Sequence, residues 1–333
     1  MSRKLITIST IMTLMSTSVI ADVPNVAADI APIHSLVSRV MDGVGAPKLI
    51  VQSGASPHGY RLRPSEAKAL QDADHVFWMG EELTPWLDSA IGTLASKASV
   101  TTLLDQQGVI LHDFREGALF EAHDHSAHGD DDHDDHDDHK DHDDHDDHDD
   151  HDDHDDHDDH DDHGSHDPHA WLSPENAKLW LNIIASKLSV SDPENAATYF
   201  MNAAAGQAEI EAMIAEVKAT LKPVQGGKFV VFHDAYQYFE NDFDFYASGA
   251  ISLGDSSDPS PARIEKVQKR IRDEGIQCVL AEPQFKKGLV ATVMEGSDAT
   301  ASVIDPLGAE LETGPKLYTR LIKNMAKTLR NCL

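Results

Sequence analysis

The sequence is poor in positive charge. Its 333 residues hold 27 Lys and Arg against 58 Asp and Glu, a formal net charge of −31. Residues 122–168 alone contain 24 Asp and one Lys, so about −23 lies there and only about −8 in the rest of the chain. A protein that binds nucleic acid presents a basic face. We therefore expect no nucleic-acid partner.

Long hydrophobic runs are lacking as well, because after the N-terminus no segment is long and apolar enough to span a bilayer. The first residues have the basic start and the short apolar core of a secretory signal, and they end in Ser18-Val-Ile-Ala21. No cysteine stands at the cleavage point to carry a lipid anchor. We predict a signal peptide over residues 1–21, cleaved near Ala21, and a mature protein that is free in an exported compartment.

Only two cysteines are present, Cys278 and Cys332. An even count in an exported chain suggests a disulfide, whereas two unrelated thiols are the alternative. Cys278 lies in the strand-like segment 276–281 and Cys332 is the penultimate residue. A bridge between them would attach the C-terminal helix to a sheet.

The most distinctive segment is a tract with a histidine at every third position, mostly as Asp-Asp-His. It has no apolar residue to bury and its like charges repel, so we expect residues 121–168 to form a disordered loop. A solvated acidic linker is the alternative, but it would not need regularly spaced imidazoles, which are common metal ligands. We predict auxiliary zinc binding by eleven histidines: His133, His136, His139, His142, His145, His148, His151, His154, His157, His160 and His163.

Strand-like and helix-like segments alternate on both sides of this tract, which is typical of parallel sheets covered by helices. Between the halves, residues 194–221 lack proline and predict a long rigid helix. Its apolar stripe comprises Ala197, Phe200, Ala204, Ala208, Met213 and Val217. We therefore predict an α/β protein of two lobes of parallel strand–helix units. The N-terminal lobe covers 22–190, the linking helix 191–222, and the C-terminal lobe 223–333.

Four residues lie at or near the ends of predicted strands and helices, where open parallel sheets bind ligands. They are His58 after strand 48–53, His169 before a helix that starts at Pro174, His233 after strand 228–232, and Asp305 after strand 302–304. Two come from each half, so they could meet across a cleft between the lobes. Three imidazoles with a carboxylate or a water form a tetrahedral zinc shell.

Other residues near these positions have simpler interpretations. We expect His34, His75 and His112 to be solvated, with His34 a weaker candidate for an outer contact of the site. The pair Asp305-Pro306 can equally form a turn or a helix N-cap. In that case a water would take the fourth place at the metal.

Five short motifs surround the candidate ligands and strand ends. They are Ser56-Pro-His-Gly-Tyr-Arg-Leu-Arg-Pro-Ser65, Asp167-Pro-His-Ala-Trp-Leu-Ser-Pro174, Phe232-His-Asp-Ala-Tyr-Gln-Tyr-Phe239, Ala281-Glu-Pro-Gln-Phe285 and Asp305-Pro-Leu-Gly308. Together they resemble the ZnuA family, the periplasmic zinc-binding components of bacterial high-affinity zinc ABC importers. The similarity extends over nearly the whole mature chain.

This resemblance implies two lobes joined by a long helix, with zinc bound in the cleft by His58, His169 and His233. Manganese-binding relatives have a carboxylate at the position of His233, which favours zinc. Some zinc-binding members have Glu where this chain has Pro57, so the fourth place is left to Asp305 or water. The paired cysteines match disulfide-bearing members, and some members carry a His- and acid-rich loop at this location.

We therefore expect a monomeric periplasmic protein, not an enzyme, that captures Zn²⁺ and delivers it to a membrane permease. A periplasmic zinc buffer is one alternative. A zinc hydrolase is another, because three histidines and an open place also describe a catalytic site. Against a hydrolase, the sequence has no His-Glu-x-x-His, and Glu282 is the only obvious spare base near a strand end.

Overall fold

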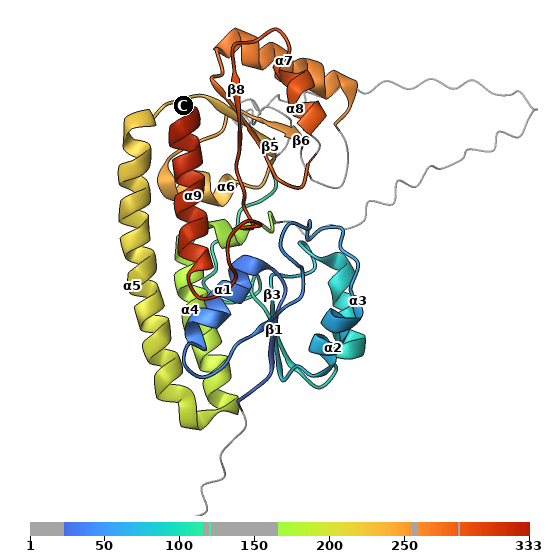
Figure 1. Ribbon diagram of the computed structural model, residues 1–333, viewed down its shortest axis with the longest axis vertical. Coiled ribbons are helices and arrows are strands. Elements are labelled where there is room, and N and C mark those ends of the chain that lie inside the picture. Colours follow the sequence, from blue (N-terminus) through green and yellow to red (C-terminus); the bar gives the residue numbers. More distant parts are fainter. Residues whose placement is uncertain (1–22, 116–119, 121–165, 253, 255–258, 286) are drawn as a thin grey trace, which may run out of the picture.

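The computed structural model describes residues 23–115, 120, 166–252, 254, 259–285 and 287–333, which form two α/β lobes (Figure 1). The predicted signal peptide and all eleven tract histidines lie outside the described residues. Among the residues that are described, no helix has the length and apolar character that a membrane span requires.

The N-terminal lobe is built on a fully parallel sheet with the strand order β2-β1-β3-β4. Successive strand residues face opposite sides. Phe77 accordingly packs with α1 and α4, whereas Val76 and Trp78 pack with α2 and α3. The elements are β1 (Val26–Ala28), α1 (Ala31–Val40), β2 (Lys48–Leu49), α2 (Pro64–Gln71), β3 (His75–Trp78), α3 (Pro85–Leu94) and β4 (Ser99–Thr102).

The C-terminal lobe repeats this plan with the parallel order β6-β5-β7-β8. Val231 and Leu280 face the core shared with α6 and α9, and Val230 and Val279 face α7 and α8. The elements are β5 (Phe229–His233), α6 (Gln237–Phe243), β6 (Ala250–Ser252), α7 (Pro261–Glu274), β7 (Cys278–Ala281), α8 (Lys287–Met294), β8 (Thr300–Val303) and α9 (Leu317–Cys332). The two parallel sheets confirm the predicted fold class.

A pair of long helices connects the lobes. After the 3₁₀ turn η2 (Ala170–Leu172), helix α4 (Pro174–Ser191) runs to the far end of the N-terminal lobe, where η3 (Pro193–Asn195) reverses the chain. Helix α5 (Ala196–Leu221) then returns along it into the C-terminal lobe and ends in η4 (Lys222–Val224) (Figure 1). Its 26 residues make it about 39 Å long. The predicted linking helix is confirmed.

The buried face of α5 differs from the predicted stripe, of which only Met213 and Val217 are buried. Alanines are spread over several faces of this helix, so apolar spacing alone does not select one. The close approach of α4 does: a Cβ on Gly206 would lie 2.9 Å from a methyl of Leu181. The buried residues are Tyr199, Ala203, Gly206, Ile210, Met213, Val217 and Leu221.

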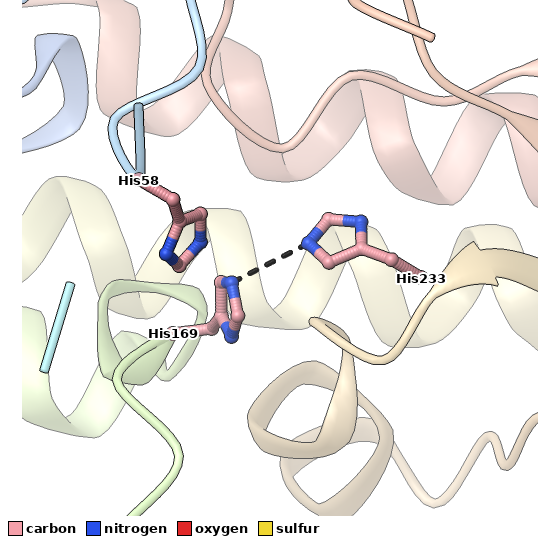
Figure 2. A group of neighbouring side chains, drawn as sticks. All are labelled: His58, His169 and His233. Atoms are coloured by element: carbon pink, nitrogen blue, oxygen red, sulfur yellow. Dashed lines mark hydrogen bonds between the residues drawn. The ribbon is translucent and has the colours of Figure 1, made fainter. Parts of the chain in front are cut away.

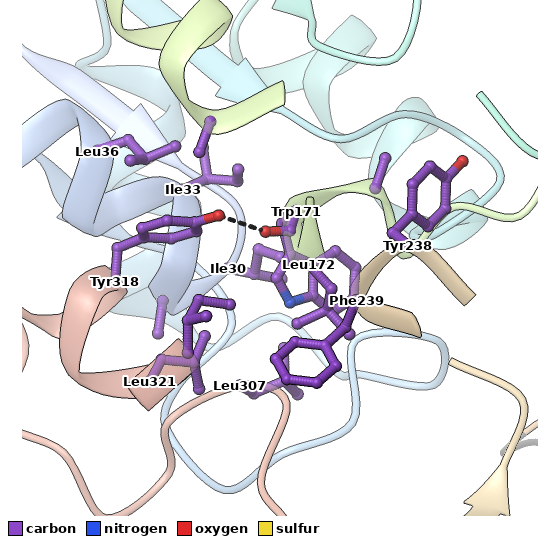
Figure 3. Packing of buried hydrophobic residues seen from close by; sticks show 14 of the residues in the cluster. Ile30, Ile33, Leu36, Trp171, Leu172, Tyr238, Phe239, Leu307, Tyr318 and Leu321 are labelled. Atoms are coloured by element: carbon purple, nitrogen blue, oxygen red, sulfur yellow. Dashed lines mark hydrogen bonds between the residues drawn. The ribbon is translucent and has the colours of Figure 1, made fainter. Parts of the chain in front are cut away.

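Helix α9 also packs across both lobes, lying along α5 and against α1 (Figure 1). Near its start, the Tyr318 N–H donates to Ser35 Oγ, and Ser35 Oγ donates to the Gly314 carbonyl. The Tyr318 hydroxyl donates to the Trp171 carbonyl at 2.9 Å (Figure 3). One hydrophobic core therefore continues through both lobes. The division of the chain at residues 190 and 222 stays a prediction.

A disulfide joins Cys278 in β7 to Cys332 at the end of α9, with a Cα–Cα separation of 5.6 Å. The predicted pairing is confirmed, and the alternative of two isolated thiols is excluded. The bridge fixes the last turn of α9 to the central part of the second sheet.

Removing this disulfide is expected to lower the free energy of unfolding by up to about 4 kcal/mol, the entropy of closing a loop of this length. The cysteines are separated by 54 residues. Chemical denaturation of a Cys278→Ala/Cys332→Ser double variant beside the oxidised parent measures the loss. An unchanged denaturation midpoint would contradict a stabilising role.

Candidate metal centre

Three histidines from distant parts of the chain converge between the lobes: His58, His169 and His233 (Figure 2). One ligand atom from each lies within 4.8 Å of those of the other two. His169 and His233 are buried and His58 is half-buried. Among the residues that the structure describes, this is the one group of His, Cys, Asp or Glu side chains close enough to hold a metal ion.

His58 lies in the loop between β2 and α2, and the loop is attached on both sides. The indole N–H of Trp86 donates to the Pro57 carbonyl at 2.7 Å, which fixes the residue before the ligand to α3. Two residues after it, the Tyr60 hydroxyl donates to Glu66 of α2. His58 is therefore the ligand that the N-terminal lobe contributes from the loop between β2 and α2, and hydrogen bonds on both sides hold this loop in place.

His169 is oriented by Asp167, two residues earlier. Asp167 Oδ1 accepts from the His169 backbone N–H at 2.9 Å and lies 2.6 Å from its Nδ1. Asp167 is only 1% exposed, and this burial raises the pKa of its carboxyl to about 7. Just after the ligand, η2 leads into α4, whose N-terminus is capped by Ser173.

His233 is the last residue of β5 and is oriented by a carboxylate that directly follows the neighbouring strand, β7. Val231 pairs with Leu280, so two residues further along each strand His233 lies opposite Glu282. The distance from His233 Nδ1 to Glu282 Oε1 is 2.5 Å, and both side chains are buried. Glu282 Oε2 accepts in turn from the Gln284 side-chain amide.

These contacts determine which ring nitrogens face the centre. A carboxylate accepts from Nδ1–H, which leaves the Nε2 lone pair of His169 and of His233 available for a metal. The two Nε2 atoms are 3.4 Å apart (Figure 2). Two nitrogens on a tetrahedral zinc lie about 3.3 Å apart, given Zn–N distances of about 2.0–2.1 Å. The pair therefore has the spacing that a shared zinc ion needs.

Asp305 does not join this cluster. Its carboxylate accepts three backbone N–H groups, those of Leu307, Gly308 and Ala309, so it organises the turn after β8. The reason lies in the strand order: β7 separates β8 from β5, and Glu282, which directly follows β7, takes the place beside His233. The turn interpretation of Asp305-Pro306 is therefore the one that the structure favours.

The expectation of solvated side chains is wrong for His34 and His75, which are both buried. His34 Nε2 lies 3.2 Å from the Pro47 carbonyl, so it supports α1 rather than the metal site. His75 contacts the Ser191 hydroxyl. The His112 ring packs at a tilt against the Tyr238 ring, with the ring centroids 4.7 Å apart.

Two important carboxylates, Asp167 and Glu282, were not assigned a role at the site from the sequence. Their signals were present: Asp167 precedes a ligand by two residues, and Glu282 directly follows a buried strand. Glu282 was considered only as a spare base for a hydrolase. In the structure the Glu282 carboxylate instead contacts His233 and Gln284.

The expected loop at 121–168 extends too far at its C-terminal end, because residues 166–168 have a defined structure. Asp113 and His166 form an antiparallel bridge, and their side chains contact each other at 2.9 Å. The Asp167 N–H donates to the His112 carbonyl. We call residues 112–115 and 166–168 the stem. Asp167 and Pro168 of the stem are buried, and Asp167 contacts the ligand His169.

A long joining helix and a ligand cluster between two parallel α/β lobes place the chain in the class of solute-binding proteins that hold a metal ion. A crystal structure of ZnuA has a TM-score of 0.70 to this fold at 19% identity, covering 93% of this chain and 99% of that chain. A zinc-bound 138–173 deletion mutant of ZnuA also has a TM-score of 0.70 at 19% identity, covering 93% and 98%.

The sequence comparisons identify the family. The family described as ZnuA, zinc-uptake complex component A, periplasmic, matches residues 26–332. The high-affinity zinc uptake system protein ZnuA of Brucella abortus (strain 2308) is 50% identical over 308 residues, covering 92% of this chain and 91% of that protein. The protein of the same name from Paracoccus denitrificans (strain Pd 1222) is 46% identical over 314 residues, covering 94% and 93%. The chain belongs to the ZnuA family.

Proposed function

We propose that this protein captures one Zn²⁺ ion between its lobes and delivers it to the membrane permease of a zinc ABC importer. The observation that carries this proposal is the convergence of His58, His169 and His233, with their ligand atoms within 4.8 Å of one another. Membership of the ZnuA family supports zinc as the ion and uptake as the purpose.

In this proposal a water completes the zinc shell. Three neutral imidazoles and a water are a common set for zinc, which is borderline in softness and accepts nitrogen and oxygen ligands together. Asp305 is engaged by three backbone N–H groups, which supports water over a carboxylate as the fourth ligand. Because this shell carries no net ligand charge, zinc can be released without separating it from a bound anion.

The protein is proposed to act in the periplasm as a monomer, after removal of residues 1–21. Family membership supports the compartment. Binding and delivery rather than catalysis is favoured, because Glu282 is buried and hydrogen-bonded to His233 and Gln284. A hydrolase would need that base free to activate the zinc-bound water.

The His/Asp tract is proposed to bind further zinc ions more weakly and to raise the zinc concentration near the cleft. The stem supports this arrangement, because it pairs Asp113 with His166, which lie on either side of the tract in the sequence, and it ends one residue before His169. A tethered segment presents whatever it binds at a high effective concentration. A zinc buffer without delivery is the alternative function.

Replacing the eleven tract histidines with asparagine is expected to leave one tight zinc site and to remove several weaker ones. The weaker sites should fade in the parent as pH falls through about 6.5, because protonated imidazole cannot bind metal. Zinc titration of both proteins by calorimetry, at pH 7.5 and 5.5, measures the stoichiometry. If the asparagine variant kept the parent's stoichiometry, the tract would be only an acidic spacer.

The variant with asparagine at the eleven tract positions also distinguishes zinc delivery to a permease from zinc buffering. A delivery protein without tract histidines should still restore growth of a zinc-starved strain that lacks its own zinc-binding component. A His58→Ala variant with an intact tract should not. The reverse result would show that zinc storage by the tract is the main function.

A further inference from the structure

One arginine near the metal centre makes contacts that zinc binding by three histidines does not explain. Arg115 belongs to the stem, and its guanidinium contacts two carboxylates of the C-terminal lobe, Asp234 and Glu240. Its Nε is 3.0 Å from each carboxylate oxygen of Asp234. Its Nη1 donates to Glu240 at 2.6 Å. Both acceptors are buried, with side chains 7% and 1% exposed.

The position of Asp234 connects this ion cluster to the metal. Asp234 directly follows His233, the ligand at the end of β5, and Glu240 lies in α6. Burial raises the pKa of both carboxyls, and the hydrogen bonds from Arg115 are the largest influence that lowers them. Without the guanidinium, two buried acids close to each other would be left without their cation, and the segment that carries His233 would lose its anchor.

The stem connects the same cluster to a second ligand. Its two segments are paired through Asp113 and His166. The Tyr238 hydroxyl of α6 donates to the Asp167 carbonyl at 2.7 Å and accepts from the His112 N–H. Asp167 in turn orients His169. Arg115 and Tyr238 therefore attach both segments of the stem to the C-terminal lobe, beside the two buried histidines.

We propose that Arg115 is a positioning residue for zinc: by binding Asp234 and Glu240 it fixes His233 relative to His169 across the two lobes. The 3.4 Å spacing of the two Nε2 atoms is then set before the ion arrives. This inference rests on the proposed zinc site, but its test keeps that site intact. It gives the stem a role in metal binding that is separate from the tract.

Charge and position make opposite predictions for Arg115. The removal of a cation near a dication's site should by electrostatics alone tighten zinc binding. If Arg115 acts by position, its removal should weaken binding, because the histidine pair loses its preset spacing. A lysine at this position keeps the charge but cannot form the planar two-pronged contact with a carboxylate. The direction of the change therefore distinguishes the two effects.

The experiment uses the full chain with the eleven tract histidines changed to asparagine, so that only the cleft site reports. Arg115→Gln and Arg115→Lys are compared with Arg39→Gln, the matched control. The Arg39 side chain is 13% exposed, close to the 17% of Arg115. It donates two hydrogen bonds to Glu209 of α5, away from the site. Zinc affinity is measured by competition with a chromophoric chelator. The visible spectrum of the Co²⁺-loaded protein reports coordination geometry.

Arg115→Gln is expected to weaken zinc binding about tenfold or more, the effect typical of groups that orient metal ligands. Arg115→Lys should weaken it too, and both should change the Co²⁺ spectrum, while Arg39→Gln changes neither. Glu240→Gln, which removes one partner of the arginine, should give a smaller loss that does not add to that of Arg115→Gln.

Unchanged or tighter zinc binding in Arg115→Gln, with the parent's Co²⁺ spectrum, would overturn the proposal and leave the histidine site itself standing. If Arg115→Gln did not fold, Arg115→Lys and Glu240→Gln would test the proposal in its place. Zinc binding like that of the parent in both variants would overturn the proposal. A loss of zinc affinity in Arg39→Gln equal to that in Arg115→Gln would show a general effect of removing a buried arginine and would also overturn the proposal. Parent-like zinc binding in His58→Ala, His169→Ala and His233→Ala would instead contradict the assignment of the site to the three histidines.

Discussion

Replacing any one of His58, His169 or His233 with alanine is expected to weaken zinc binding by more than about 100-fold. The loss should exceed that for residues that only orient a ligand, which is typically 10- to 100-fold. Two of the ligands are buried, so the vacated position cannot be filled by a surface side chain. The measurement is a chelator competition on full chains with the tract histidines changed to asparagine.

His34→Ala and His75→Ala are the controls for this series, because neither side chain belongs to the cluster. Both should bind zinc within about twofold of the parent. His58→Ala should retain more affinity than the other two variants, since His58 is half-buried and water can enter its place. Parent-like affinity in all three cluster variants would rule out this site.

The second large effect is expected at Glu282. Changing it to alanine should weaken zinc binding roughly 10- to 100-fold, although the side chain does not reach the metal. The carboxylate holds His233 Nδ1 at 2.5 Å and so determines which ring nitrogen faces the ion. Asp167→Ala should have a comparable effect through His169, whose Nδ1 it contacts at 2.6 Å.

Glu282→Gln distinguishes orientation from charge. The amide oxygen can still accept from Nδ1–H, so the ring keeps its orientation but loses the neighbouring negative charge. An intermediate loss, nearer tenfold, would show that both matter. Glu265→Ala on the exposed side of α7 is the control and should leave zinc affinity unchanged. If Glu282→Ala bound zinc like this control, Glu282 would have only a structural role.

Much of the fold could be predicted because its signals are local. Alternating strand and helix patterns identify parallel α/β units, and the absence of proline identifies α5. His58 and His233 could be selected because parallel sheets present residues after the carboxyl ends of their strands. His169 could be selected from the loop before a helix, and the resemblance to the ZnuA family supports all three. The disulfide required only two cysteines in an exported chain.

What could not be predicted depends on the order of strands and on the packing of helices. The sequence does not reveal that β7 lies between β5 and β8, and this order gives Glu282 rather than Asp305 the place beside His233. The burial of Tyr199 rather than Phe200 on α5 depends on how closely α4 approaches, which only the assembled structure defines. No sequence pattern around Arg115 indicates its role, because its partners Asp234 and Glu240 follow more than 100 residues later.

The contacts of α9 have a consequence for the order in which this protein can fold. The last helix completes the core around α1, and Ser35 meets Tyr318 across 283 positions of sequence. A chain that is synthesised from its N-terminus cannot finish its first lobe until α9 has been made. Cys332 is the last residue of α9, so the disulfide closes only after that step. The growing chain must therefore remain protected from aggregation until α9 is complete, and an isolated N-terminal half should fold poorly.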